Sequence, residues 1–201
     1  MINRPKNPNR RLVVAGIFGA VASIALPFPA LAFSVEKARK LIGKVIQDIQ
    51  KIINSGKDEP AMLRDFEKIF SDYADVYRIG LLVLGVDGRS ASDAQKRAFA
   101  SAFQGYISRK FGRRFRELVG GNIEVVSAKA VKSFYEVTTS TQLQGQAPFE
   151  VIYVVSDKNG RFIDMKIEGI SLVKSERSEI GAMLDKRGGD LNKVIAHLKT
   201  I

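Results

Sequence analysis

Apolar side chains recur at every third or fourth position in the first half of the chain, which places them on one face of an α-helix. Amphipathic helices are therefore predicted within residues 34–56, 58–85 and 92–118. In the second of these segments, residues 76–84 are expected to form a separate short helix. Each segment also carries polar positions on its opposite side, so each can cover a core with one face and meet water with the other.

Local signals at the starts of these segments agree with the periodicity. Ser34 can cap the first helix, and Pro60 suits a first turn, where its missing N–H would have no partner in any case. Ser92 and Gln95 have the spacing of a capping box, in which each side chain bonds the backbone of the other residue. We expect helices to begin at these three places.

After Gly120-Gly121 the pattern changes to the alternation of β-strands, in segments rich in Val, Ile, Thr, Phe and Tyr. Asn159-Gly160 predicts a tight hairpin turn, since both residue types tolerate positive φ. The four strand segments are residues 123–128, 131–141, 149–156 and 161–172. Helical spacing returns over residues 175–189 and 190–201. This order predicts an α+β fold, with a four-stranded antiparallel sheet packed against a layer of helices.

The chain has more large apolar residues than one sheet face needs. Phe149, Val151 and Tyr153 lie on one side of their strand, whereas Ile152 and Val154 lie on the other. Several helix segments add aromatic stripes of their own. The simplest interpretation is a packed core; the alternative is an apolar cavity between the sheet and the helices.

The N-terminal segment has the pattern of a secretory signal peptide. Four basic residues and no acid precede an apolar run, and Ala30-Leu31-Ala32 fits the small-x-small cleavage rule. We expect residues 1–32 to be a cleaved signal peptide, and residues 33–201 to form a single domain in the periplasm. The alternative is a membrane anchor that stays attached.

The formal net charge is +11, which limits the classes of partner. Export makes nucleic acid an improbable partner, and the sequence has no RNA-binding or helix-turn-helix pattern. One side of the helix over residues 92–118 is basic, either as a solvated face or as a contact surface for an acidic partner or a membrane. Its basic residues are Lys96, Arg97, Arg109, Lys110, Arg113, Arg114 and Arg116.

Ser171 and Lys174 have the spacing of the nucleophile pair in penicillin-recognising serine enzymes. In those enzymes the serine begins a helix, but here Ser171 falls within a strand pattern, where residues three apart point to opposite faces. A Lys-Thr-Gly partner motif is absent from the sequence. We expect a strand-to-helix corner instead, with Gly169 bending the last strand and Ser175 capping the next helix.

No other residue pattern indicates catalysis or a metal site. His197 is the only histidine and the chain has no cysteine, so a zinc site would need carboxylates or water for its other ligands. Asp164 and Glu168 are the one pair of carboxylates worth considering, and we interpret them as solvated or bonded to turns. The sequence predicts a protein that is not an enzyme and that has no catalytic residue, metal or cofactor.

Several segments together resemble the MlaC family, the toluene-tolerance type phospholipid-binding proteins of the Gram-negative periplasm. They are Asp164-Met165, "EGISL" from residue 168, "SERSEIGAMLDKRGGDLNKVIAHL" from residue 175, and "VLG" from residue 83. The spacing of Gln95, Phe99, Phe103, Ile107 and Phe111 is also similar to the family's middle section.

Two departures from the family pattern stand out. Gly88-Arg89 occupies the place of a common Trp-Arg pair, and Gly160 and Ile163 stand where aromatic residues are common in the family. These departures put the rim of a pocket and a partner contact there in doubt, and they leave the fold expectation unchanged.

The resemblance implies a soluble, monomeric carrier that shuttles glycerophospholipid between the outer and inner membranes and so maintains outer-membrane lipid asymmetry. The acyl chains would occupy the cavity, and the head group would stay outside. The implied partners are an outer-membrane lipoprotein complex, an inner-membrane ABC transporter complex and, transiently, a membrane surface. Phospholipid would be cargo and not a cofactor.

Nine residues are predicted to face the lipid, chosen from the apolar stripes of the helices and strands. They are Phe70, Leu82, Phe103, Tyr106, Tyr135, Val137, Tyr153, Met165 and Ile167. The rival hypothesis is an exported adaptor that has a solid core, binds only protein partners and carries no lipid.

Overall fold

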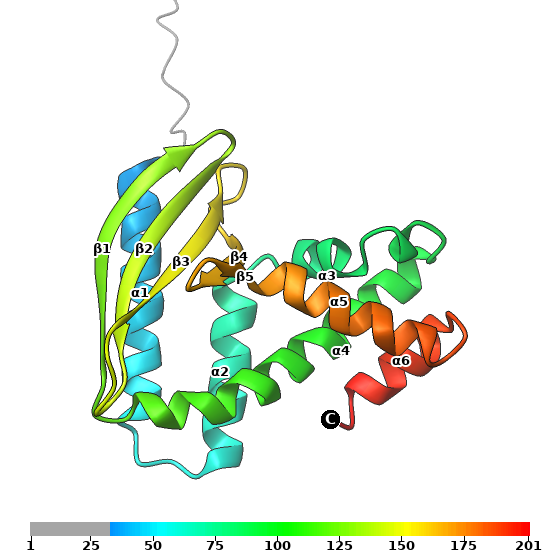
Figure 1. Ribbon diagram of the computed structural model, residues 1–201, viewed down its shortest axis with the longest axis horizontal. Coiled ribbons are helices and arrows are strands. Elements are labelled where there is room, and N and C mark those ends of the chain that lie inside the picture. Colours follow the sequence, from blue (N-terminus) through cyan, green and yellow to red (C-terminus); the bar gives the residue numbers. More distant parts are fainter. Residues whose placement is uncertain (1–32) are drawn as a thin grey trace, which may run out of the picture. The chain divides into compact units, whose positions relative to one another are not determined.

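Six α-helices and a five-stranded sheet make up residues 33–201, which the computed structural model describes except for the side chains of Arg113, Phe115 and Arg116 (Figure 1). The expected signal peptide, residues 1–32, lies outside the described residues. The helices are α1 (Val35–Ile53), α2 (Glu59–Tyr73), α3 (Val76–Leu84), α4 (Asp93–Gly112), α5 (Leu172–Asp185) and α6 (Leu191–Leu198). Two 3₁₀ turns are η1 (Asp87–Arg89) and η2 (Arg113–Leu118). The strands are β1 (Asn122–Val131), β2 (Phe134–Gln142), β3 (Phe149–Ser156), β4 (Phe162–Ile167) and β5 (Ile170–Ser171).

The predicted helix starts are confirmed by their hydrogen bonds. The Ser34 hydroxyl accepts from the backbone N–H of Lys37 at 3.2 Å, and α2 carries proline in its first turn. Ser92 and Gln95 form the reciprocal capping box, with bonds of 3.0 and 3.2 Å. Each contact is local, and the residues that make it could therefore be identified from their spacing.

The sheet is an antiparallel meander in which neighbouring strands are also neighbours in sequence, in the order β1-β2-β3-β4-β5. The predicted count of four strands is wrong by one, because the last segment breaks at Glu168 and Gly169. These residues have φ values of +49° and +81° and form a two-residue turn that folds Ile170 back onto Ile167. Gly169 therefore makes a hairpin turn, and not the bend within one strand that we expected.

The corner between β5 and α5 also differs from the prediction. Ser171, and not Ser175, caps α5: its hydroxyl accepts from the N–H of Lys174 at 3.1 Å and donates to Asp164 at 2.6 Å. The second carboxylate oxygen of Asp164 accepts from the N–H of Val173 at 3.0 Å. Asp164 thus holds the start of the helix one turn earlier than the local sequence indicates.

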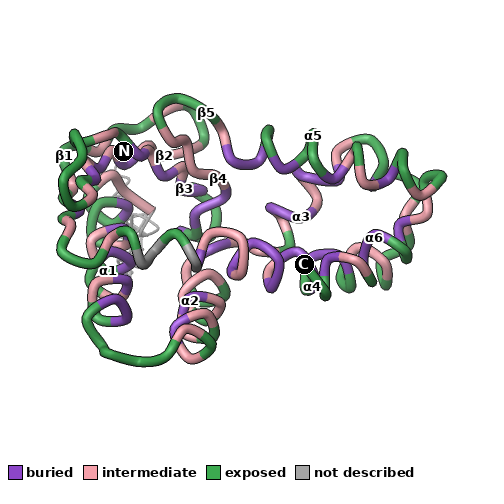
Figure 2. The backbone as a smooth tube through the Cα atoms, turned by 60° about the horizontal axis from the view of Figure 1, so that its bottom comes forward, coloured by how far each residue is buried: buried purple, intermediate pink, exposed green. Residues whose placement is uncertain are grey.

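The helices cover the sheet and then continue away from it (Figure 1). Helix α1 packs along β1 and β2, and α2 lies beside α1 and α4. Helix α4 also contacts α3 and α6, while α5 packs on α3 and β4. Buried positions alternate with exposed ones along these helices, as Figure 2 shows for α1 and α4. Within residues 33–201, no helix is both long enough and apolar enough to cross a membrane.

Candidate functional site

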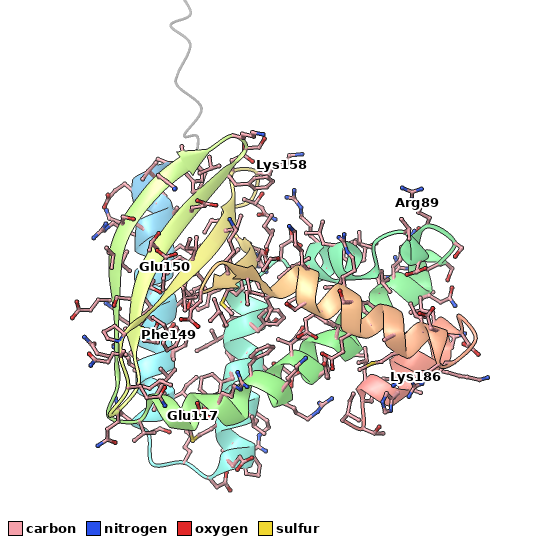
Figure 3. All side chains as sticks on the ribbon, in the orientation of Figure 1. Arg89, Glu117, Phe149, Glu150, Lys158 and Lys186 are labelled. Carbon is pink, nitrogen blue, oxygen red and sulfur yellow. The ribbon has the colours of Figure 1, made fainter. Side chains whose placement is uncertain are left out.

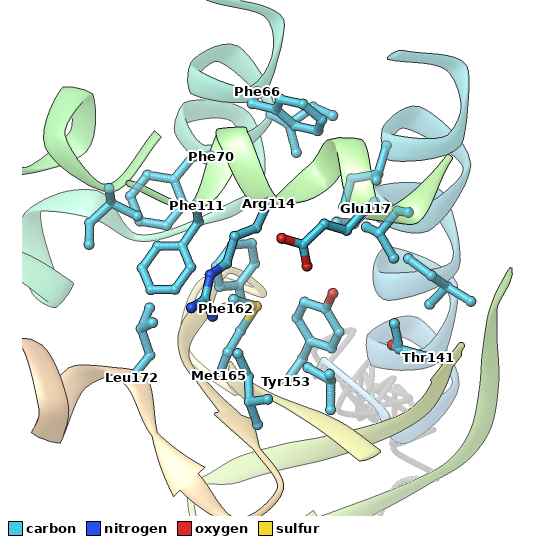
Figure 4. A pocket seen from close by; sticks show the side chains of 18 of the residues that line it. Phe66, Phe70, Phe111, Arg114, Glu117, Thr141, Tyr153, Phe162, Met165 and Leu172 are labelled. Carbon is cyan, nitrogen blue, oxygen red and sulfur yellow. The ribbon is translucent and has the colours of Figure 1, made fainter. Parts of the chain in front are cut away.

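A cavity of about 250 Å³ lies between the sheet and the helices (Figure 4). Its walls come from α1, α2, the C-terminal part of α4, η2, four strands and the first residue of α5. The lining residues are Val45, Ile49, Phe66, Ile69, Phe70, Ile107, Ser108, Phe111, Arg114, Glu117, Leu118, Ile123, Thr141, Leu143, Phe149, Val151, Tyr153, Phe162, Met165, Ile167 and Leu172. Most of them are aliphatic or aromatic, so the cavity suits an apolar ligand.

The floor of the cavity follows from strand alternation. Phe149, Val151 and Tyr153 are two residues apart on β3, and side chains at this spacing point to the same face. The pairing register places Ile167 opposite Val151, and Met165 opposite Tyr153. Side chains from two strands therefore form one continuous apolar surface.

The opposite wall follows from helical spacing. Val45 and Ile49 are four residues apart on α1, so they lie one above the other on the face turned toward the sheet. On α2, Phe70 packs against Phe162 of β4, with ring centroids 5.9 Å apart. Phe162 also meets Tyr153 edge-on at 6.0 Å. Aromatic contacts thus join the helix wall to the floor.

Two hydroxyl groups interrupt the apolar lining. Tyr153 and Thr141 are 94–95% buried, since their exposed fractions are 6% and 5%. Neither side chain makes a hydrogen bond to another described residue, and neither hydroxyl oxygen is among the fully buried unpaired atoms, so both have accessible surface in the cavity. Burial raises the pKa of Tyr153 to about 12, so its phenol keeps its proton and can donate a hydrogen bond.

Two charged side chains mark the mouth of the cavity. Arg114 and Glu117 are exposed to solvent and also line the cavity, and both extend from η2 into it (Figure 4). They are the charged residues of the lining within the described part of the chain. In the sequence, Arg114 is only one of several residues on the basic side of a predicted helix, and no pattern distinguishes Glu117 from other charged positions.

Four of the nine residues predicted to face lipid lie in the cavity wall. They are Phe70, Tyr153, Met165 and Ile167, which the fold brings together from α2, β3 and β4. That they contact a lipid stays a prediction.

The other five predicted residues are not among those that line the cavity. Phe103 is fully buried between the rings of Phe99 and Tyr106, at centroid distances of 5.7 and 6.0 Å. Val137 is fully buried in the core on β2, and Leu82 is half-buried on α3.

The two tyrosines among these five are held by hydrogen bonds elsewhere. The Tyr106 hydroxyl donates to Glu179 at 2.9 Å, and the Tyr135 hydroxyl donates to the carbonyl oxygen of Phe33. The reason for the difference is the path of α4: most of its apolar face meets other helices, and only its last turns reach the cavity.

The sequence did contain a signal for some of the residues that were missed. Phe149 and Val151 share a strand face with Tyr153, so the alternation could have identified them once Tyr153 was chosen. No comparable signal separates Val45, Ile49 or Phe66 from other apolar positions on their helices.

The basic side of α4 does not form one continuous patch among the described residues. Arg109 donates to the carbonyl oxygen of Leu198, the last residue of α6, and to that of Ile201 beyond it. Lys110 bonds to Glu176 and Glu179 of α5, at 2.8 and 2.5 Å. These contacts tie α4 to the two last helices, so they have a structural role.

Lys110 and Glu176 form an ion pair in which the Glu176 side chain is buried and the pKa of each group is shifted. Burial lowers the pKa of Lys110, but its hydrogen bonds to Glu176, Glu179 and Tyr106 outweigh this effect and raise the pKa overall. Burial raises the pKa of Glu176, and the bond to Lys110 only partly opposes it. One carboxylate oxygen of Glu176 is buried without a partner among the described residues.

Comparison with known proteins gives a match to a family model and matches to solved structures. The family model described as "MlaC protein" matches residues 40–200, which is most of the chain. The solved structure of a phospholipid-binding protein from Ralstonia solanacearum, in complex with a phospholipid, is similar to this chain with a TM-score of 0.69. The two sequences are 16% identical, and the match covers 81% of this chain and 95% of that one. At this identity the likeness shows a shared fold.

Proposed function

This chain belongs to the MlaC family, and on that basis we propose that it is a periplasmic carrier of glycerophospholipid between the outer and inner membranes. The single observation that supports the proposal most strongly is the cavity, whose walls are apolar over most of their surface. Such a cavity can hold acyl chains while the head group stays in water. The phospholipid bound by the Ralstonia solanacearum protein, which has the same fold, supports this choice of ligand.

The energetics explain why a carrier is needed. Two acyl chains contain roughly thirty methylene groups, and exposing each to water costs about 0.8 kcal/mol, or more than about 20 kcal/mol together. A free lipid molecule will therefore not cross an aqueous compartment at a useful rate. Apolar side chains offset this cost by replacing the membrane interior, and the proposal requires no catalytic residue and no cofactor.

The volume of the cavity has a consequence for loading. At about 250 Å³ it lies below the roughly 300–1,000 Å³ of typical ligand pockets. Two acyl chains need more space than this, so we expect the helix wall and the sheet to move apart when lipid enters. The contacts between Phe70 and Phe162 cross this boundary and would have to change.

The proposal extends to the partners of such a carrier. A monomer would receive or deliver lipid at an outer-membrane lipoprotein complex and at an inner-membrane ABC transporter complex, with transient contact to a membrane surface. This exchange would maintain outer-membrane lipid asymmetry. The expected signal peptide would deliver the protein to the periplasm.

Mass spectrometry of an organic extract of the purified protein tests the proposal. The protein would be expressed with its N-terminal segment in a Gram-negative host and purified without detergent. We expect close to one two-chain phospholipid per protein molecule. Protein that carries no lipid, and that moves no labelled lipid between donor and acceptor vesicles, would favour the adaptor hypothesis.

Two adjacent residues of β3 provide a matched pair of variants. Val151 lines the cavity, whereas Ile152 is half-buried on the opposite face of the sheet. We expect Val151→Glu to lose most of the extracted lipid and Ile152→Glu to retain it. Circular dichroism of both variants would check that each keeps its fold.

A further inference from the structure

The two charged residues at the cavity mouth are placed together by the geometry of η2. A 3₁₀ turn has three residues per turn, so side chains three positions apart lie one above the other. Arg114 and Glu117 have this spacing and both extend into the cavity (Figure 4). They form no ion pair with each other, and neither has a salt bridge to another described residue. Each charge is therefore available to a ligand.

The two unpaired hydroxyl groups lie deeper in the same cavity. Tyr153 on β3 points its hydroxyl toward the side from which Glu117 enters, and Thr141 belongs to the neighbouring strand β2 (Figure 4). Neither hydroxyl oxygen is among the fully buried unpaired atoms of the described residues, so both have accessible surface in the cavity and can form a hydrogen bond with a ligand atom. The cavity therefore has two charged side chains at its mouth and two hydroxyl groups further inside, among apolar walls.

We propose that these residues form a subsite for a zwitterionic head group, which makes an aminophospholipid such as phosphatidylethanolamine the preferred cargo. Arg114 binds the phosphate, and Glu117 binds the ammonium group. The Tyr153 hydroxyl donates to an ester oxygen of the glycerol region, where the head group meets the acyl chains. This inference rests on the proposed carrier function and adds a head-group preference to it.

The opposite signs of the two charges favour this ligand over an anionic one. Phosphatidylglycerol offers a phosphate to Arg114 but only hydroxyl groups to Glu117, whose charge repels the phosphate. Both side chains are exposed, and an exposed ion pair changes an equilibrium by about two- to fivefold. We therefore expect a preference of that size and not an absolute selection.

Competition between two lipids with identical acyl chains tests the inference. The protein is equilibrated with vesicles that contain equal amounts of phosphatidylethanolamine and phosphatidylglycerol, and then separated from them. Mass spectrometry gives the total lipid per protein and the ratio of the two lipids. The deciding quantity is the change in this ratio between the wild-type protein and Glu117→Gln, compared with the change caused by Glu36→Gln, which raises the net charge of the protein by the same one unit.

We expect Glu117→Gln to lower the ratio of phosphatidylethanolamine to phosphatidylglycerol by about two- to fivefold. Glu36→Gln removes the same charge from an exposed position in the first turn of α1 and should keep the wild-type ratio. Arg114→Gln should lower the retention of both lipids, whereas Arg89→Gln on η1, which projects from the helices away from the sheet (Figure 3), should not. Tyr153→Phe should lower total lipid without changing the ratio.

The two proposals fail in different ways in this experiment. Bound lipid with the same ratio in Glu117→Gln and the wild-type protein would overturn the head-group subsite and leave the carrier function in place. A wild-type protein that binds neither lipid would overturn the carrier function, and the subsite with it.

Discussion

A charge placed in the cavity wall should weaken lipid binding by an amount that depends on pH. Ile167 lines the cavity from β4 and is half-buried, so a glutamate at this position can reach water until lipid covers it. Loading would then either bury the carboxylate or require that it take up a proton. We therefore expect Ile167→Glu to bind lipid more weakly than Ile167→Gln, which has nearly the same shape and no charge.

The size of this effect has an upper limit that can be calculated. Protonating an ordinary glutamate, with a pKa near 4.3, costs about 3.7 kcal/mol at pH 7 and about 1 kcal/mol at pH 5. The glutamate can always bind lipid in its protonated form, so the cost of protonation is the largest penalty that the charge can impose. The charge therefore weakens binding by at most about 500-fold at pH 7 and about fivefold at pH 5. Any packing defect is shared with the glutamine variant and cancels in the comparison.

Sedimentation with sucrose-filled vesicles that carry a labelled phospholipid would measure lipid uptake by both variants at the two pH values. Circular dichroism would show whether each variant remains folded. Equal uptake by the glutamate and glutamine variants at pH 7 would refute the placement of Ile167 against the lipid. A defect of the same size at pH 5 would refute the explanation by charge.

Three further predictions concern stability. For Glu176, burial raises the pKa, so the folded state favours the protonated form, and its contribution to stability is lost as the pH rises through the folded-state pKa. The melting temperature of the wild-type protein relative to Glu176→Gln should therefore fall as the pH rises above the ordinary pKa of a glutamate; a constant difference would contradict the shift. Ser171→Ala removes the cap of α5 and its bond to Asp164, so the free energy of unfolding measured in urea should fall by about 1 kcal/mol. Lipid binding should stay unchanged. A folded variant that no longer binds lipid would contradict the structural role of Ser171. Gly121→Ala would place a Cβ 2.3 Å from a backbone oxygen of β2 and should lower the free energy of unfolding by about 1–3 kcal/mol. Gly181→Ala in α5 meets open space and should raise the free energy of unfolding by about 0.5–1 kcal/mol. Equal effects of the two substitutions in urea unfolding would show that Gly121 does not approach β2 this closely.

Predictions that depended on local contacts agree with the structure. The short helix over residues 76–84 has the predicted bounds, and the caps at Ser34 and Ser92 form with residues three positions away. The α+β arrangement follows from the change of period after Gly120-Gly121. In each case the residues that make the contact are neighbours in sequence, so their spacing contains the necessary information.

Predictions that depended on distant contacts were less complete. Asp164 moves the start of α5 to Ser171, and its influence acts across a hairpin turn that the alternation pattern did not reveal. The prediction that Phe103 faces the lipid rested on an apolar stripe, but in the structure that part of the stripe packs among helices.

The sequence by itself determined the elements of this protein, their order and the apolar surplus that makes a cavity possible. Only the tertiary structure decided which apolar stripes enclose the cavity and which fill the core, because a buried phenylalanine has the same periodicity in both places. The tertiary structure also places Arg114 and Glu117 at the mouth of the cavity. The sequence could not predict this, because the position of a charged residue along a helix does not show which residues lie opposite it in space. Helical and strand periods report which side of an element is apolar, and the path of the chain in space determines what that side meets.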